Sequence, residues 1–262
     1  MLRKPLNSSL RIKFPFTCHE LKWSRDPFRF IVPSMVGMSG RFYIERYQHW
    51  LGHNESVLSK HVLQPRKTGL ITFGNHQCFI DDCFIWTSLP YLFHLRWRKH
   101  RWVLGSADVC FHKFIDQPLK QKLITWFFCA GKTIPITHGD GIFAQPGLDW
   151  AIERLKQGDW INLYPEGEVN KTGDWMRFYW GIGRLIQEAP GSTILPFYHI
   201  GLDQIYPPDL DPDKRKFHKN KAVTMLWGDP ITFPATDKTD DVETDLLSIQ
   251  KITERLQVVL QD

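Results

Sequence analysis

Short β-forming runs alternate with helical patterns from residue 55 onward, and this alternation limits the possible folds more than any other feature of the chain. Segments between the runs repeat apolar residues at helical spacing. Alternating strands and helices predict an α/β fold with a mainly parallel central sheet, flanked by helices on both faces. Six runs have the β-branched and aromatic composition of strands: 69–73, 101–105, 132–137, 159–164, 193–198 and 222–227.

Three amphipathic helices can be located from their apolar stripes, which recur with a period near 3.6 residues. In a sheet of this kind, functional residues are expected just after the C-terminal ends of strands. The stripes are Leu148, Ala151, Ile152 and Leu155; Phe178, Gly181, Ile182 and Leu185; and, in a helix over 243–260, Leu246, Ile249, Ile252, Leu256 and Val259.

Aromatic residues make up 14% of the 262-residue chain, with 11 Trp and 18 Phe, which is more than a core of this size requires. Aromatic residues also favour membrane interfaces. No uncharged apolar run reaches the ~18–20 residues that cross a bilayer. The best candidate, 28–44, is interrupted by Arg29, Pro33 and Arg41. Two interpretations are equally open: a helix lying in the membrane interface and an ordinary buried helix.

No repeat or long linker divides the chain. The simplest partition is an N-terminal extension with an interfacial membrane-associated segment, 1–54, followed by a single domain, 55–262. Residues 1–19 contain basic side chains and no acidic one, a weak resemblance to a transit peptide. We find no secretory signal.

Charge and cysteine content narrow the classes of partner. The net charge is +5, and basic residues gather only at 96–101 and 214–221. Such clusters either contact phosphate groups and anionic lipids or lie as solvated turns. We expect no nucleic-acid partner. The five cysteines form no CxxC pair, so neither a disulfide framework nor a zinc site is indicated, and we expect no metal and no cofactor.

A histidine and an aspartate follow the strand at 69–73. Five residues on a helix rotate ~140°, so His76 and Asp81 can meet only if the histidine precedes the helix. Gly74 and Asn75 supply that break. A carboxylate bound to one imidazole nitrogen fixes the tautomer and leaves the other nitrogen as a base. Asp82 is an alternative partner or a helix cap, and His76 could instead be a satisfied core residue.

The substrate of such a base would be a hydroxyl group, because GxSxG is absent and no serine or cysteine is specified as a nucleophile. A second polar turn follows the strand at 159–164, in LYPEGEVN over 163–170. Proline ends the strand, glycine allows close backbone approach, and Glu166 is placed at the sheet edge. A plain strand-to-loop turn would have the same composition.

Together, NHQCFID and YPEG, about 90 residues apart, resemble the glycerolipid acyltransferase superfamily, whose hallmarks are HxxxxD followed by a PEG motif. The similarity covers roughly 28–235 and includes RFxWGIGRLI at 177–186 and ILPxxHxG at 194–201. The resemblance implies that His76 is the catalytic base and Asp81 its partner. It also implies substrate contacts from residues of the two motifs: Asn75, Glu166, Gly167 and Asn170.

Two departures from the superfamily concern the acceptor phosphate. The usual PEGTRS motif carries an arginine, whereas this chain reads Glu168, Val169 and Asn170. His138 stands where relatives commonly have arginine, and we include it among the substrate-binding candidates. The cations that could replace the missing arginine are Lys132, Arg177 and Arg184.

The finer motif wording implies an acyl-CoA-independent transacylase. Such an enzyme moves acyl chains from phospholipids, such as phosphatidylcholine, to lysophospholipids, especially monolysocardiolipin, in cardiolipin remodelling. The implied location is monotopic, on the outer and inner mitochondrial membranes, facing the intermembrane space. Two alternatives are an acyl-CoA-dependent lysophospholipid acyltransferase and a non-catalytic membrane lipid-binding protein.

Overall fold

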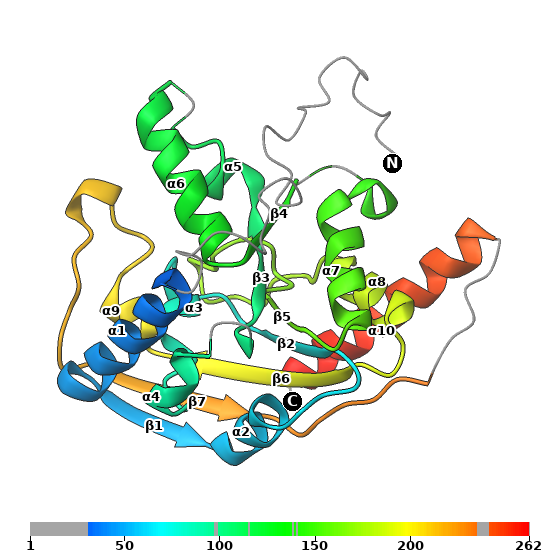
Figure 1. The fold of residues 1–262 in the computed structure, drawn as a ribbon, viewed down its shortest axis with the longest axis horizontal. Helices are drawn as coiled ribbons and strands as arrows, with labels where there is room; N and C mark the ends of the chain where they lie inside the picture. Colours follow the sequence, from blue (N-terminus) through cyan, green and yellow to red (C-terminus); the bar gives the residue numbers. More distant parts are fainter. Residues whose placement is uncertain are drawn as a thin grey trace.

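A computed structural model describes residues 31–261, apart from 97–98, 115, 138, 140 and 235–240. Within this part of the chain, seven strands form one sheet in the order β1-β7-β6-β2-β5-β3-β4 (Figure 1). The strands are β1 His49–His53, β2 Leu70–Gly74, β3 Trp102–Ser106, β4 Thr133–Ile136, β5 Trp160–Leu163, β6 Thr193–Ile200 and β7 Ala222–Trp227.

Neighbouring strands are parallel except for the antiparallel pair β6 and β7. The predicted mainly parallel sheet is therefore confirmed. The helices are α1 Ile31–Tyr47, α2 Glu55–Leu63, α3 Asp81–Phe84, α4 Tyr91–His94, α5 Ala107–Cys110, α6 Pro118–Ala130, α7 Pro146–Lys156, α8 Gly181–Glu188, α9 Leu202–Ile205 and α10 Val242–Gln261, with short 3₁₀ turns η4 Ile142–Ala144 and η5 Pro212–Lys214.

Helices pack on both faces of the sheet, as expected for parallel strands. One apolar cluster joins the sheet to α7, α8 and α10, through residues that include Leu148, Ile182 and Leu256 of the predicted stripes. The second cluster lies on the other face and includes Ile44 of α1 and Leu58 of α2. Phe178 is buried in the first cluster but lies before α8, because that helix begins only at Gly181.

Strand β1 was not predicted. Its sequence, HWLGH, contains no β-branched residue, yet it pairs in parallel with β7 from His49 to His53. The sheet therefore includes residues on both sides of the predicted boundary between 54 and 55, and the extension is not separate from the sheet. Its membrane association stays a prediction.

Helix α1 covers most of the segment for which two interpretations were open. Val32, Gly37 and Ile44 are buried against the rest of the molecule, whereas Met35 and Phe42 are 63% and 57% exposed. One face thus packs as an ordinary helix, and the other presents apolar side chains outward. Among the described residues, no helix is both long and apolar enough to span a bilayer.

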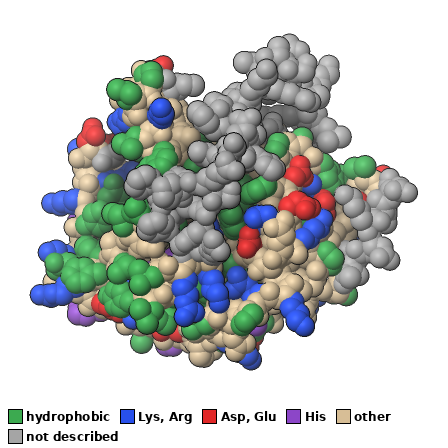
Figure 2. All heavy atoms as spheres, viewed as in Figure 1, with side chains coloured by type: hydrophobic (Ala, Val, Ile, Leu, Met, Phe, Trp, Pro, Cys, Tyr) green, Lys and Arg blue, Asp and Glu red, His purple; other side chains and the backbone are tan. Residues whose placement is uncertain are grey.

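Helix α6 extends away from the sheet, with its C-terminal end attached (Figure 1). Only Cys129 and Ala130 of this apolar helix are buried. Leu119 and Leu123 are 86% and 63% exposed. Hydrophobic side chains show at the tip of α6 and over α1 and α4 (Figure 2). This arrangement leaves a discontinuous apolar surface on one side of the molecule.

Candidate active site

The histidine of the HxxxxD motif lies in the loop that follows β2, and α3 begins at the motif aspartate. His76 therefore precedes the helix, as the spacing requires. Its Nδ1 lies 3.0 Å from Asp81 Oδ2. Gly74 allows this geometry because any Cβ there would collide with the ring and carbonyl of Phe197 on β6. The loop thus leaves the sheet at a position where only glycine fits against Phe197.

Asp81 is fully buried, and one of its oxygens collects several donors. Besides His76, Oδ2 accepts the backbone N–H groups of Gln77 at 2.8 Å and Cys78 at 2.9 Å. His199 Nε2 lies 3.3 Å from the same oxygen. Burial raises the pKa of the Asp81 carboxyl, but His199 and His76 outweigh it and lower the pKa to about 2. The carboxylate is therefore ionised at neutral pH.

The His76 ring has one engaged nitrogen and one accessible side. It stacks on Tyr164 with ring centroids 4.1 Å apart and an interplanar angle of 15°. Its side chain is 20% exposed, and Nε2 has no partner among the described residues. Because Asp81 accepts from Nδ1–H, the neutral ring presents the lone pair of Nε2 outward. This arrangement can take a proton from a hydroxyl group.

The PEG turn lies against the same loop. Gly167 N–H donates to Tyr164 O at 3.0 Å, and Gly167 adopts a φ of 76°. The backbone N–H of His76 donates to Glu166 Oε1 at 3.2 Å, and Asn170 N–H donates to His76 O at 2.7 Å. The structure thus brings the two motifs together, as parallel neighbours β2 and β5 require.

Glu166 is 4% exposed, and its second oxygen, Oε2, is buried with no partner among the described residues. Burial raises the pKa of this carboxyl to about 7, although the His76 N–H opposes the shift. Protonated Glu166 therefore coexists with the ionised form near neutral pH. Gly167 N–H is already bound, so it does not provide an oxyanion donor.

Two predicted substrate contacts have structural partners instead. The Asn75 amide is buried; its Nδ2 donates to His199 O at 2.8 Å, and its Oδ1 accepts His199 N–H at 2.9 Å. The Asn170 side chain accepts Gly173 N–H at 2.9 Å and donates to Asp174 O at 2.7 Å. The Asn75 amide therefore continues the strand pairing, and the Asn170 amide closes a loop. The spacing of the motifs did not reveal these two roles.

The candidate replacement cations are placed differently from one another. Lys132 directly precedes β4 and so lies at the N-terminal end of that strand, whereas His76 follows the C-terminal end of β2. The buried Nζ of Lys132 donates to His100 O at 2.9 Å. Arg184 forms ion pairs with Asp149 and Glu188. The structure therefore does not bring Lys132 to the site, and it engages Arg184 elsewhere, because burial of either cation requires local acceptors.

Arg177 is an exposed cation in the segment that follows the PEG turn, although exposed Lys171 is nearer to the turn in sequence. Its guanidinium carbon lies 5.9 Å from the centroid of the Trp180 ring. Two residues later, Tyr179 N–H donates to Pro165 O at 2.8 Å, so this segment returns to the PEG turn. His138 lies outside the described residues.

Asp82 points away from Asp81 into a buried polar network. It pairs with Arg101, which is 5% exposed, and accepts Asn162 Nδ2 at 3.2 Å. Asn162 Oδ1 in turn accepts Thr72 Oγ1 at 2.8 Å. Asp82 is therefore neither the partner of His76 nor a simple cap. Sequence reasoning missed Arg101 and His199, although His199 belongs to the ILPxxHxG motif.

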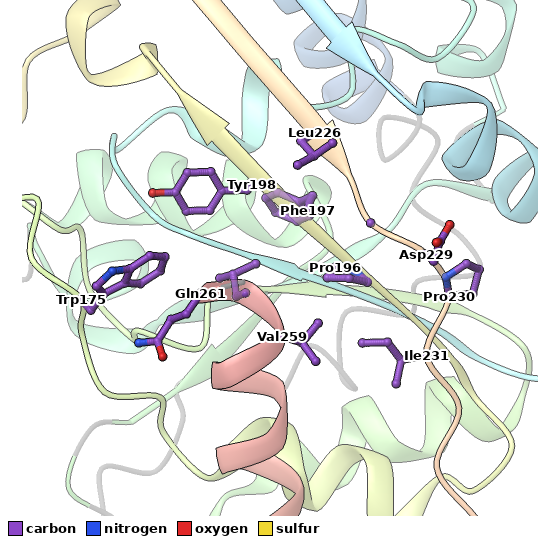
Figure 3. Close-up of a pocket in the computed structure, with 12 residues that line it drawn as sticks. Trp175, Pro196, Phe197, Tyr198, Leu226, Asp229, Pro230, Ile231, Val259 and Gln261 are labelled. Carbon is purple, nitrogen blue, oxygen red and sulfur yellow. The ribbon is translucent and has the colours of Figure 1, made fainter.

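An open groove of ≈ 550 Å³ lies between β6, the chain after β7 and the end of α10 (Figure 3). Its lining is mostly apolar and includes Trp175, Tyr198 and Ile231, with Asp229 at its rim. His76, Asp81 and Glu166 do not line it. The groove is thus separate from the histidine centre. Among the described residues, no group of three or more His, Cys, Asp or Glu side chains could hold a metal ion.

Comparisons with known proteins agree with this fold and site. The profile of the family described as Acyltransferase matches residues 55–200. The crystal structure of the 1-acyl-sn-glycerophosphate (LPA) acyltransferase PlsC from Thermotoga maritima superposes with a TM-score of 0.51 at 15% identity, covering 88% of this chain and 79% of that one. Here the likeness shows a shared fold.

The chain therefore belongs to the acyltransferase family, in the glycerolipid acyltransferase superfamily. Within it, the chain is similar to tafazzin of Drosophila melanogaster, with 33% identity over 68% of this chain and 44% of that protein. It is also similar to N-acylphosphatidylethanolamine synthase of Arabidopsis thaliana, with 34% identity over 79% of this chain and 70% of that protein. The matched region thus spans less than half of the Drosophila relative.

Proposed function

We propose that this protein is a phospholipid–lysophospholipid transacylase. It moves an acyl chain from a phospholipid such as phosphatidylcholine to a lysophospholipid, especially monolysocardiolipin, without acyl-CoA. The observation that carries the proposal is His76, with Nδ1 bound to buried Asp81 and Nε2 accessible beside the PEG turn. Similarity to tafazzins supports the choice of reaction within the family.

The chemistry proceeds through general base catalysis. His76 Nε2 removes the proton from the lysolipid hydroxyl, and the oxygen attacks the ester carbonyl of the donor. As the tetrahedral intermediate collapses, the bond to the donor glycerol oxygen breaks, and that oxygen takes the proton from the His76 imidazolium. One ester is broken and one is formed, so no net hydrolysis or oxidation occurs. Asp81 stabilises the imidazolium and fixes the ring.

Glu166, Gly167 and Arg177 have different roles in the substrate binding that we propose. Glu166 offers Oε2, which is buried and has no partner among the residues that the structure describes, to a substrate hydroxyl or headgroup. Gly167 shapes the turn, and Arg177 supplies an exposed cation for a phosphate near that turn. A phosphate held at Arg177 would place the glycerol backbone of the lysolipid between that cation and His76.

Membrane attachment follows from the exposed apolar surface. We assign residues 1–54 to an extension with an interfacial segment, and α1, α4 and α6 to the surface that meets the lipid. Met35, Leu92 and Leu119 are exposed by 63%, 72% and 86%. Helix α6 carries Lys120 and Lys122 and no acidic residue, which suits anionic headgroups. The compartment we propose is the mitochondrial intermembrane space.

A second candidate acceptor is an amine. The similarity to N-acylphosphatidylethanolamine synthase covers most of both chains, and the same base could deprotonate the amine of an ethanolamine headgroup. The product would then contain an amide instead of an ester. Acyl-CoA as donor is the other enzymatic alternative, and lipid binding without catalysis is the alternative from a different class.

The test uses purified full-length protein with labelled phosphatidylcholine and unlabelled monolysocardiolipin in vesicles. We expect labelled cardiolipin and lysophosphatidylcholine to form without acyl-CoA, and no free fatty acid. Separate reactions replace monolysocardiolipin with phosphatidylethanolamine, or add acyl-CoA. Transfer only after acyl-CoA is added would contradict the transacylase, labelled amide product would favour the second candidate, and no transfer in any reaction would favour a binding protein.

A further inference from the structure

His199 is a fully buried histidine at the end of β6 that lies beside the catalytic pair. Its Nε2 lies 3.0 Å from Asn75 O and 3.3 Å from Asp81 Oδ2. Its Nδ1 is also buried and has no partner among the described residues. The proposed function uses His76, Asp81 and the PEG turn, and leaves this third side chain without a role.

The tautomer of His199 follows from its neighbours. Both atoms near Nε2 are hydrogen-bond acceptors, a backbone carbonyl and a carboxylate, so Nε2 must bear the proton and donate. Nδ1 has neither a donor nor an acceptor in reach in the part of the chain that the structure describes. A neutral ring protonated on Nε2 satisfies these contacts, and its N–H is shared between Asn75 O and Asp81 Oδ2.

The backbone on both sides of this contact is fixed by reciprocal hydrogen bonds. The Asn75 amide donates to His199 O and accepts His199 N–H, at 2.8 and 2.9 Å. These bonds extend the pairing of β2 with β6 beyond Gly74, where the regular register ends. His199 and the loop that carries His76 are thereby held in one rigid frame, which orients the imidazole toward Asp81.

We propose that His199 is a positioning residue for acyl transfer: its Nε2–H holds Asp81 Oδ2 in line with His76 Nδ1. This inference rests on the proposed function of the same site. Asp81 Oδ1 has no hydrogen-bond partner within the described part of the chain, so rotation of the carboxylate would exchange the two oxygens and lengthen the bond to His76. His199 opposes that rotation from the side of β6, whereas the N–H groups of Gln77 and Cys78 act from the loop.

The variants His199→Phe and His199→Gln separate this role from simple packing. Phenylalanine keeps a ring in the core but has no donor, whereas glutamine keeps an N–H at a similar reach. We expect His199→Phe to lower kcat by up to about 100-fold, the effect of a misplacement of about 1 Å, with KM nearly unchanged. His199→Gln should recover most of kcat. His94→Phe, at a buried histidine of α4, is the matched control and should leave kcat unchanged.

A double-mutant cycle tests whether His199 acts through Asp81. If it does, adding His199→Phe to Asp81→Asn should cost much less than the same change costs in the wild-type protein. Equal fold-losses in both backgrounds, or equal losses for the phenylalanine and glutamine variants, would overturn the proposal. Retention of wild-type kcat by His199→Phe would do the same.

A spectroscopic measurement tests the tautomer without depending on activity. Nitrogen-15 NMR of histidine-labelled wild-type protein in lipid nanodiscs should show His199 protonated on Nε2 and unprotonated on Nδ1. Resonances are assigned by comparison with His199→Gln. The opposite tautomer would overturn the proposal even if acyl transfer is confirmed, and the predicted tautomer would stand even if the acyl donor proves to be different.

Discussion

The carboxylate of Asp81 is ionised although no water reaches it, because four donors converge on one of its oxygens. A buried charge with such partners is held in a single orientation. The neighbouring Asp82 has a different task, since its pairing with Arg101 ties the start of α3 to β3 and β5. Two adjacent residues of one type therefore separate into a site residue and a scaffold residue.

Replacement of His76 and Asp81, the proposed catalytic pair, should affect turnover unequally. His76→Ala removes the base, and we expect kcat to fall by about 10²- to 10⁴-fold. Asp81→Asn should lose less, because the amide oxygen can still accept from His76 Nδ1 while the negative charge is gone. Initial rates of acyl transfer from phospholipid to lysophospholipid measure both effects, and circular dichroism checks the fold. Near-wild-type turnover by His76→Ala would rule out the mechanism.

The buried carboxyl of Glu166 should make stability depend on pH. Burial raises its pKa from 4.5 to about 7, so the folded protein binds this proton more tightly than the unfolded chain. Its contribution to stability is therefore complete below pH 4.5 and declines as pH rises toward 7. Glu166→Gln lacks this decline. The free energy of unfolding of the variant, minus that of wild type, should therefore increase from pH 4.5 to 7 and remain constant above pH 7.

Urea denaturation at several pH values measures the difference. The matched control is Glu168→Gln, two residues further on at an exposed position of the same loop. We expect the difference between this control and wild type to stay flat from pH 4.5 to 7. Parallel curves for both variants would show that Glu166 does not carry the effect.

Helix α6 is tied to the domain by buried Cys129 and Ala130 at its C-terminal end and by Gln121, which donates to Phe111 O. Its Leu119 and Leu123 side chains, in contrast, are 86% and 63% exposed. Full burial of one leucine stabilises by about 1.5–3 kcal/mol, so two such residues can anchor a peripheral protein. The double variant Leu119→Gln/Leu123→Gln should therefore bind vesicles of phosphatidylcholine and cardiolipin at least roughly tenfold more weakly, by cosedimentation.

The control for α6 changes two equally apolar positions on a different helix. Leu247 and Val258 of α10 are 52% and 53% exposed, and α10 lies on the other side of the molecule (Figure 1). Leu247→Gln/Val258→Gln should bind vesicles like wild type. High salt should release little of the wild-type protein, because apolar burial is not screened. Equal loss of binding by both double variants would remove α6 from the membrane contact.

The strands could be predicted because their β-branched and aromatic residues are local signals. All six predicted runs overlap strands, and the strand ends identified the edge where His76 and Glu166 meet. Strand β1 gave only a weak signal, since Trp50 is its one aromatic residue and it has no β-branched one, and its place in the sheet depends on pairing with the distant β7. The hydrogen-bond partners of side chains could not be predicted from the sequence either. Nothing local distinguishes Asn75, which pairs with the backbone of His199, from an amide that faces substrate.

In the molecule as a whole, the site is assembled from three adjacent strands at the centre of the sheet. Strand β2 leads to His76, β5 leads to Glu166, and β6 ends with His199. These elements lie far apart in the chain, so the site exists only when the central pairings have formed. A hydrogen bond between buried Thr72 and Asn162 connects β2 to β5, and Asn162 also donates to Asp82 at the start of α3.

The pairing of β1 with β7 has a consequence for biosynthesis. Strand β1 is made early, but its partner at 222–227 is translated long afterwards, and such non-local pairs form slowly. Until then, the nascent chain presents an unpaired strand edge beside the apolar α1, a surface that chaperones bind. We expect ribosome-bound chains to show protease protection at 49–53 only after 222–227 has emerged. Protection in shorter chains would mean that β1 finds another partner first.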